Sequence, residues 1–188
     1  DVPVDLNHAS LRGGPTAERA RARVAREAEL GARLHHPGIQ AVYSAALEGE
    51  QPYLVQELLH GGTLAERLER DGPLPLEEAV ELGIALAGAL EHAHAHGVLH
   101  RDLKPDNVLY DQHGVPRLSD FGLALGLEES ALRLTASRAI LGTPIYIAPE
   151  QLHGEGRDEP PVDAYGLGAL LYHALTGEPP INGHSLQE

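Results

Sequence analysis

The spacing of apolar residues changes near Leu59, and this change limits the folds that the chain can adopt. Before Leu59, residues 39–47 and 52–59 are rich in residues that favour strands, and the polar stretch "EGEQ" separates them. This pattern predicts a β-hairpin. After Leu59, residues 63–70 and 75–96 show the spacing of amphipathic helices. The sequence therefore predicts an α+β fold in which a mixed unit and a helical unit are joined by a short connector.

Two further helices and one strand are expected outside this central region. Residues 16–34 are rich in Ala, Glu and Arg, and Thr16 stands where an N-cap would lie. Residues 164–177 form an uncharged run of 14 residues, which is too short to cross a bilayer and predicts a fully buried helix. Residues 2–6 alternate weakly, and Pro3 restricts such a strand to a sheet edge or a terminus.

Composition favours a soluble globular domain and excludes several classes of function. The 188 residues include 14 basic and 28 acidic side chains, and the formal charge of −14 disfavours nucleic acid and anionic membranes as partners. The absence of Cys excludes disulfides and cysteine-based zinc sites and favours the cytoplasm. The chain shows no signal peptide and no membrane segment, which leaves open a membrane tether outside it. The absence of Met suggests a processed product or a piece of something longer.

The stretch "HRDLKPDN" concentrates groups that are suited to phosphoryl transfer. Asp102, Lys104 and Asn107 lie within five residues of one another, and Asp120 follows in "LSDFGLA". An Asp and an Asn together can hold Mg²⁺, while a separate Asp accepts a proton and a Lys neutralises phosphate charge. These are the groups that phosphoryl transfer requires.

Three motifs in order, "HRDLKPDN", "DFG" and "GTPIYIAPE" (142–150), resemble the catalytic core of a eukaryotic-type serine/threonine protein kinase, close to the bacterial branch. The resemblance implies a protein-kinase-like two-lobed fold that is incomplete at both ends. Residues 1–57 would form a partial N-lobe of strands and one helix, and residues 58–188 a partial, mostly helical C-lobe. The implied activity is transfer of the γ-phosphoryl group of MgATP to a Ser or Thr hydroxyl of a protein substrate.

The resemblance also assigns catalytic roles to individual residues. Asp102 would accept or orient the proton of the substrate hydroxyl, and Lys104 would contact the transferring phosphate. Asn107 and Asp120 would bind the metal ions that bridge the phosphates. Thr143 would hydrogen-bond near Asp102 and Lys104 and shape the pocket for the residue that follows the phosphoacceptor.

The resemblance assigns a second group of residues to nucleotide binding and to the support of the catalytic loop. Glu57 would offer its backbone C=O, and Leu59 its N–H, to the adenine edge. Leu109 would pack under the adenine, and Gln56 would be an uncommon polar gatekeeper. Asp163 would tie the helix that follows it to the catalytic loop.

By the same resemblance, residues 120–150 form the activation segment. This segment contains Ser130, Thr135 and Ser137. A phosphate on Thr135 or Ser137, including one added by autophosphorylation, would pair with Arg101. The alternative is that these hydroxyls only keep a loop soluble.

The chain also departs from the family pattern. It contains no glycine-rich phosphate loop, and the Arg that would pair with Glu150 is missing. If residues 2–6 are the third strand of the family, Asp5 replaces the phosphate-gripping Lys and forms a like-charge pair with Glu27. Gly31 then stands where a bulky side chain would pack on Phe121. The alternative is a different register, with the Lys supplied by another strand.

Two classes of function follow from these observations. The first is an active serine/threonine protein kinase, which the retained catalytic residues favour. The second is a pseudokinase or scaffold module that binds partners or nucleotide with little phosphoryl transfer.

The histidines allow a further alternative. His92 and His96 are four residues apart on one predicted helical face, which is a spacing that can bind zinc. The favoured interpretation is the polar end of a helix that leads into the catalytic loop. His100 is interpreted as a packed, hydrogen-bonded core residue rather than as a base.

Overall fold

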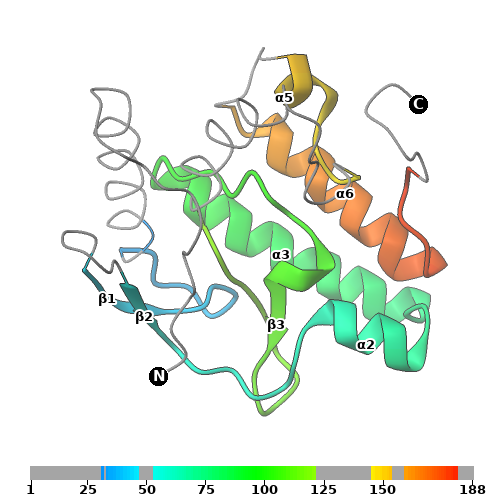
Figure 1. The fold of residues 1–188 in the computed structure, drawn as a ribbon, viewed down its shortest axis with the longest axis horizontal. Helices are drawn as coiled ribbons and strands as arrows, with labels where there is room; N and C mark the ends of the chain where they lie inside the picture. Colours follow the sequence, from blue (N-terminus) through cyan, green and yellow to red (C-terminus); the bar gives the residue numbers. More distant parts are fainter. Residues whose placement is uncertain (1–30, 32, 47–52, 122–144, 154–158, 182–188) are drawn as a thin grey trace, which may run out of the picture.

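The computed structural model describes residues 31, 33–46, 53–121, 145–153 and 159–181 (Figure 1). The first strands, β1 (Val42–Ala46) and β2 (Tyr53–Gln56), form an antiparallel pair in which Val42 is opposite Gln56 and Ala46 is opposite Tyr53. The predicted hairpin is confirmed, and its strands are shorter than the sequence pattern indicated. Tertiary context commonly decides such boundaries.

The helical part begins at α2 (Leu64–Asp71), which starts at a complete capping box. The Thr63 hydroxyl accepts a hydrogen bond from the Glu66 N–H, and the Glu66 carboxylate accepts one from the Thr63 N–H. These two contacts satisfy donors that a helix start leaves free. Leu64 and Leu68 are buried one turn apart, so the helix lies with one face on the core.

Two long helices, α3 (Leu76–Ala95) and α6 (Pro161–Thr176), pack side by side and form the centre of the helical part (Figure 1). They approach closely at Gly83, where an added Cβ atom would lie 3.2 Å from a methyl group of Leu171. The prediction that the second helix is fully buried was wrong. Tyr172 is 50% and Leu175 is 42% exposed, because α3 covers only one face of α6.

A short hairpin lies between the helices and the β1–β2 pair. It consists of the 3₁₀ turn η1 (Pro105–Asn107), β3 (Val108–Tyr110) and β4 (Pro116–Leu118). Leu118 donates its N–H to Gly38 and accepts from Gln40, which joins β4 to the segment that enters β1. Residues far apart in the sequence are therefore fixed to one another beside the loop of residues 100–107.

The core gathers around this hairpin and the two long helices. Its fully buried members include Leu64, Leu86, Val108, Leu118 and Leu170. The last described helical segment before α6 is α5 (Pro149–His153). No helix in the described part of the chain is long and apolar enough to cross a membrane.

Of the helix predicted at residues 16–34, the structure describes only the end. Gly31 is helical and Arg33 lies in a turn, so the helix ends before the predicted residue 34. The strand predicted at residues 2–6, with Asp5, and the carboxylate of Glu27 lie outside the described residues.

Candidate active site

The backbone of the site adopts an uncommon conformation at two residues. Arg101 has φ = 67° and Asp120 has φ = 60°, and within the described ranges these are the non-glycine residues with positive φ. Such a conformation has a free-energy cost for an L-residue and persists only where its surroundings hold it. Both residues belong to motifs that the sequence singled out.

Asp163 supplies part of that support from the first turn of α6. It is 1% exposed, and its carboxylate accepts hydrogen bonds from the N–H of His100 at 2.9 Å and the N–H of Arg101 at 2.7 Å. The ring of His94, on α3, donates a third from Nε2 at 2.7 Å. The structure thus brings Asp163 to the loop, as the sequence predicted. The contribution of His94 was missed, because 69 residues separate the partners.

Asp102, Lys104 and Asn107 converge on one point of the loop. The Lys104 ammonium lies 2.6 Å from Oδ2 of Asp102. The side-chain amide of Asn107 donates to the Asp102 carbonyl at 2.8 Å and to its Oδ2 at 3.0 Å. Because both contacts use Nδ2, the Oδ1 atom of Asn107 is left as an acceptor for a cation or a water molecule.

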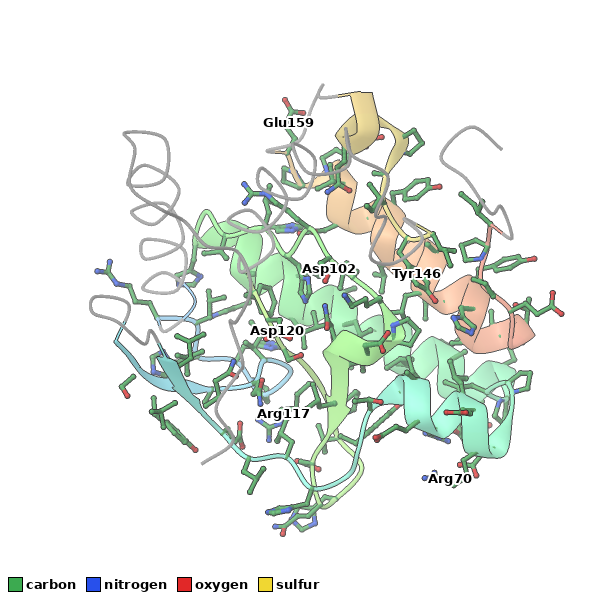
Figure 2. All side chains as sticks on the ribbon, in the orientation of Figure 1. Arg70, Asp102, Arg117, Asp120, Tyr146 and Glu159 are labelled. Atoms are coloured by element: carbon green, nitrogen blue, oxygen red, sulfur yellow. The ribbon has the colours of Figure 1, made fainter. Side chains whose placement is uncertain are left out.

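Asp120 is brought to the same place by the β3–β4 hairpin (Figure 2). Its neighbour Ser119 donates from both its N–H and its hydroxyl to the Asn107 carbonyl, so the segments that carry Asn107 and Asp120 lie side by side. Loss of water around the Asp120 carboxyl, together with the nearby Asp102, raises its pKa, and Lys104 opposes the rise. The residue remains exposed to solvent, which moderates these effects. A divalent cation would favour the ionised form.

His100 lies beneath the loop as a core residue. It is fully buried, and its ring centroid lies 4.7 Å from that of Phe121. Burial lowers its pKa against the opposing influence of Asp163, so the ring is neutral at pH 7. The interpretation of His100 as a packed core residue is confirmed, although its buried Nε2 has no hydrogen-bond partner among the described residues.

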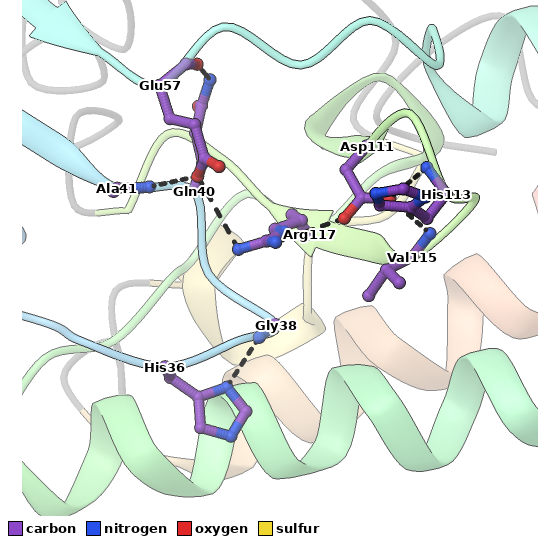
Figure 3. A network of polar contacts seen from close by, with 9 residues as sticks. All are labelled: His36, Gly38, Gln40, Ala41, Glu57, Asp111, His113, Val115 and Arg117. Atoms are coloured by element: carbon purple, nitrogen blue, oxygen red, sulfur yellow. Dashed lines mark hydrogen bonds and ion pairs between the residues drawn. The ribbon is translucent and has the colours of Figure 1, made fainter.

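The connector after β2 is fixed by a polar network around Glu57 (Figure 3). Gln40 donates from Nε2 to the Glu57 carbonyl at 2.8 Å, and the Ala41 N–H donates to the Glu57 carboxylate at 3.3 Å. Arg117 of β4 lies 3.7 Å from the same carboxylate and 3.3 Å from that of Asp111. The carbonyl that the resemblance assigns to adenine therefore already accepts one hydrogen bond and retains a second lone pair.

The connector then runs along β3. The N–H of Gly61 donates to the Tyr110 carbonyl, and the Tyr110 N–H donates to Gly62. Leu59 and Leu109 are both partly buried on this stretch. Leu109 is central in β3 and forms an isolated bridge with Thr63. These positions suit an adenine ring, which needs an apolar surface and backbone hydrogen bonds at its edge.

Gly31 lies beside Phe121, as the sequence predicted. A Cβ atom there would meet the Phe121 carbonyl at 3.8 Å, and a narrow cavity lies beside it. The cavity lining includes Val42, Gln56 and Asp120.

Most of the expected activation segment, residues 122–144, lies outside the described residues. Thr143 and the candidate phosphorylation sites Ser130, Thr135 and Ser137 lie outside the described residues. Its end, residues 145–150, is described. There the Tyr146 hydroxyl and Nδ1 of His173 on α6 form a hydrogen bond at 2.5 Å.

The zinc alternative gains no support from the described residues, in which no group of three His, Cys, Asp or Glu side chains is placed to hold a metal ion. The rings of His92 and His96 are 4.4 Å apart, and Nδ1 of His96 donates to the His92 carbonyl at 2.7 Å. This arrangement fits the polar end of a helix.

Comparison with known proteins agrees with the motifs. The family model "Protein kinase domain" matches residues 12–188. The serine/threonine-protein kinase PknB of Mycolicibacterium smegmatis is 38% identical over 189 residues, which cover 98% of this chain and 30% of that protein. The DNA damage-responsive serine/threonine-protein kinase RqkA of Deinococcus radiodurans is 44% identical over 174 residues, covering 90% of this chain and 26% of that protein. The chain thus spans less than a third of the length of these relatives.

A solved structure shows the same fold. The crystal structure of Rad53 residues 1–466 in complex with AMP-PNP matches with a TM-score of 0.71 and 30% sequence identity, covering 87% of this chain and 40% of that chain. The α+β, two-lobed fold predicted from the sequence is confirmed, in partial form. The chain belongs to the protein kinase domain family.

Proposed function

We propose that this chain carries the catalytic core of a serine/threonine protein kinase, which transfers the γ-phosphoryl group of ATP to a hydroxyl group of a protein substrate. The observation that carries the proposal is the convergence of Asp102, Lys104 and Asn107 on one loop, with Asp120 on the neighbouring segment of the same chain. Phosphoryl transfer needs positioning and charge neutralisation rather than covalent chemistry by the protein, and these side chains are suited to both.

The geometry suggests a role for each group. Asp102 is the carboxylate that orients the attacking hydroxyl and accepts its proton. Lys104, 2.6 Å from Asp102, is placed to neutralise charge on the transferred phosphoryl group. Asn107 and Asp120 present an amide oxygen and a carboxylate, which are ligands of the kind that Mg²⁺ prefers. When bound, Mg²⁺ would supply neutralisation of phosphate charge. Thr143 would complete the pocket for the residue after the phosphoacceptor.

Nucleotide binding is assigned to the connector. The Glu57 carbonyl and the Leu59 N–H would contact the adenine edge, and Leu109 would lie under the ring. We place the boundary between the partial N-lobe, residues 1–57, and the partial C-lobe, residues 58–188, at this connector. The polar network around Glu57 supports that position, because it fixes the point where the β1–β2 pair meets the helical part.

The proposed class of substrate is inferred from the names of the relatives. PknB and RqkA are both serine/threonine-protein kinases by name, so protein hydroxyls are the proposed acceptors. Autophosphorylation at Thr135 or Ser137 belongs to this proposal. Phosphopeptide mapping of the full-length protein, with Thr135→Ala and Ser137→Ala variants, would test it.

The decisive experiment is phosphate transfer from radiolabelled ATP by the full-length protein in the presence of Mg²⁺. Replacement of Asp102 by Ala is expected to lower the rate at least about 100-fold, because it removes the proposed base. Equal labelling by both proteins would refute the proposal. A rise in melting temperature with Mg²⁺ and ATP, but without transfer, would instead identify a nucleotide-binding pseudokinase.

A further inference from the structure

The strained backbone at Arg101 is held from both sides by buried polar side chains. On one side, Asp163 of α6 accepts from the Arg101 N–H at 2.7 Å. On the other side, Gln151 of α5 donates from Nε2 to the Arg101 carbonyl at 3.3 Å. A left-handed residue needs support of this kind, because its conformation is unfavourable on its own.

The orientation of the Gln151 side chain is fixed by a second contact. Its Oε1 atom accepts a hydrogen bond from the Ala148 N–H at 3.0 Å. The oxygen therefore points to Ala148, and the amide nitrogen must face Arg101. Gln151 is only 8% exposed, so an amide without these partners would lose hydrogen bonds to water without replacing them.

The carbonyl that Gln151 holds belongs to the same planar peptide unit as the Asp102 N–H. Because that unit is rigid, fixing the Arg101 carbonyl also fixes the direction in which the chain enters Asp102. Among the described residues, the Asp102 N–H itself makes a long contact, 3.4 Å, to Nδ1 of His100. Gln151 is thus well placed to determine how this peptide unit is rotated.

We propose that Gln151 is a positioning residue for Asp102. It would connect residues 145–148, at the end of the expected activation segment, with the catalytic loop. A change in the position of α5 would move the Gln151 amide and release the Arg101 carbonyl. The inference rests on the proposed function for its kinetic consequence, while its structural consequence stands apart from it.

A purely local role is the competing explanation. Gln151 would then only satisfy the Ala148 N–H at the start of α5. Gln151→Glu separates the two roles, since a carboxylate keeps the acceptor for Ala148 and has no hydrogen to donate to Arg101. Gln151→Met keeps the approximate length of the side chain and lacks both groups. Gln112→Glu, on the exposed β3–β4 turn, is the matched control.

The kinetic test measures kcat and KM of the full-length protein for ATP at pH 8 and pH 6, each variant relative to wild type at the same pH. At pH 8 we expect Gln151→Glu and Gln151→Met to lower kcat about tenfold, with KM for ATP changed less than about twofold. At pH 6 the Glu variant should recover in part, because burial raises the pKa of a carboxyl at this position above its ordinary value of about 4.3, and protonation restores a donor. The Met variant should not recover. Because the pH comparison uses Gln151→Glu at both pH values, it remains valid if Gln151→Met fails to fold.

Hydrogen exchange of residues 98–104, without nucleotide, provides a readout that does not need activity. We expect faster exchange in Gln151→Glu at pH 8 than in wild type at that pH, and no change in Gln112→Glu. Wild-type exchange and wild-type kcat in Gln151→Glu at pH 8 would overturn the inference and leave only the contact with Ala148. If the wild-type protein transfers no phosphate, the proposed function fails, and the exchange measurement still decides the role of Gln151.

Discussion

At the scale of single residues, the proposed nucleotide site depends on a side chain that reaches the connector from outside it. Gln40 donates to the Glu57 carbonyl at 2.8 Å and leaves one lone pair for the adenine edge. Replacement of Gln40 by Leu is expected to raise KM for ATP about fivefold, because the loss of one hydrogen bond loosens the connector. Steady-state kinetics would measure this, with KM for the protein substrate as the internal control. A lower KM for ATP would mean that Gln40 competes with the nucleotide for this carbonyl.

The sequence predicted the part of the site that lies within one loop. Asp102, Lys104 and Asn107 are so close in the chain that any tight turn brings them together. The supporting contacts were not predictable in the same way, except for Asp163, which the family resemblance assigned. His94 and Gln151 reach the loop from other helices, and a single sequence gives no signal for such pairs. The positive φ of Arg101 was equally invisible, since nothing in the chemistry of Arg favours it.

At the scale of elements, the approach of the connector to β3 depends on the absence of a side chain at Gly61. A Cβ atom there would lie 2.7 Å from the Tyr110 Cβ and carbonyl and from the Asp111 carbonyl. Gly61→Ala is therefore expected to lower the free energy of unfolding by about 2 kcal/mol or more, because backbone atoms must separate. Chemical denaturation would measure the loss. Unchanged stability would show that the connector moves away from β3 without cost.

Gly31 offers the opposite case. It is helical, and an added Cβ atom would be in ordinary van der Waals contact with the Phe121 carbonyl at 3.8 Å. Gly31→Ala is expected to raise the free energy of unfolding by about 0.5–1 kcal/mol, since Ala restricts the unfolded chain and fits the folded one. The same denaturation experiment checks it, and a loss of stability would contradict the space seen beside Phe121.

The contact between residues 145–148 and α6 is expected to depend on pH. Burial lowers the pKa of His173 against the opposing charge of Asp106, and burial raises the pKa of Tyr146 to about 12. In the tautomer with its hydrogen on Nε2, neutral His173 accepts from the Tyr146 hydroxyl. Because the unfolded chain binds a proton more readily at this His, its contribution to stability is present above the ordinary pKa of 6.5 and is lost as pH falls through the lowered value.

Tyr146→Phe tests this contact, because it keeps the ring and removes the hydroxyl. We expect a loss of about 1 kcal/mol in the free energy of unfolding at pH 8 and a smaller loss at pH 5. Denaturant titrations at the two pH values would measure the difference. An equal loss at both would show that protonation of His173 does not weaken the bond.

The spacing of apolar residues predicted the positions of the described helices and strands well, but it predicted poorly how far they are buried. The helices at residues 63–70 and 75–96 and the hairpin were placed within a few residues, because local spacing of apolar side chains decides them. The same uncharged run that predicted α6 suggested complete burial, which the structure does not show. Apolar character indicates that a helix packs on something, but it does not tell which of its faces are covered.

At the scale of the whole molecule, two sets of backbone hydrogen bonds among the described residues help to join the two parts of the fold. Residues 38–40 pair with Leu118, and the connector pairs with Tyr110. Both contacts end on the β3–β4 hairpin, whose neighbours are Asn107 and Asp120. The hairpin therefore links the position of the β1–β2 pair to the proposed metal ligands. The predicted change of pattern near Leu59 located this junction, although the pairing itself could only be seen in three dimensions.

The formal charge of −14 acts on the molecule as a whole. If the chain phosphorylates proteins as proposed, a basic serine peptide is attracted to it before specific contacts form, and salt weakens that attraction. We expect KM for such a peptide to rise several-fold between about 50 mM and about 300 mM NaCl, where the screening length shortens to well below about 10 Å. A neutral peptide with the same phosphoacceptor should show little change, and KM for ATP serves as a further control. The same salt response for the neutral and the basic peptide would contradict attraction by net charge, because only the basic peptide carries the charge on which it acts.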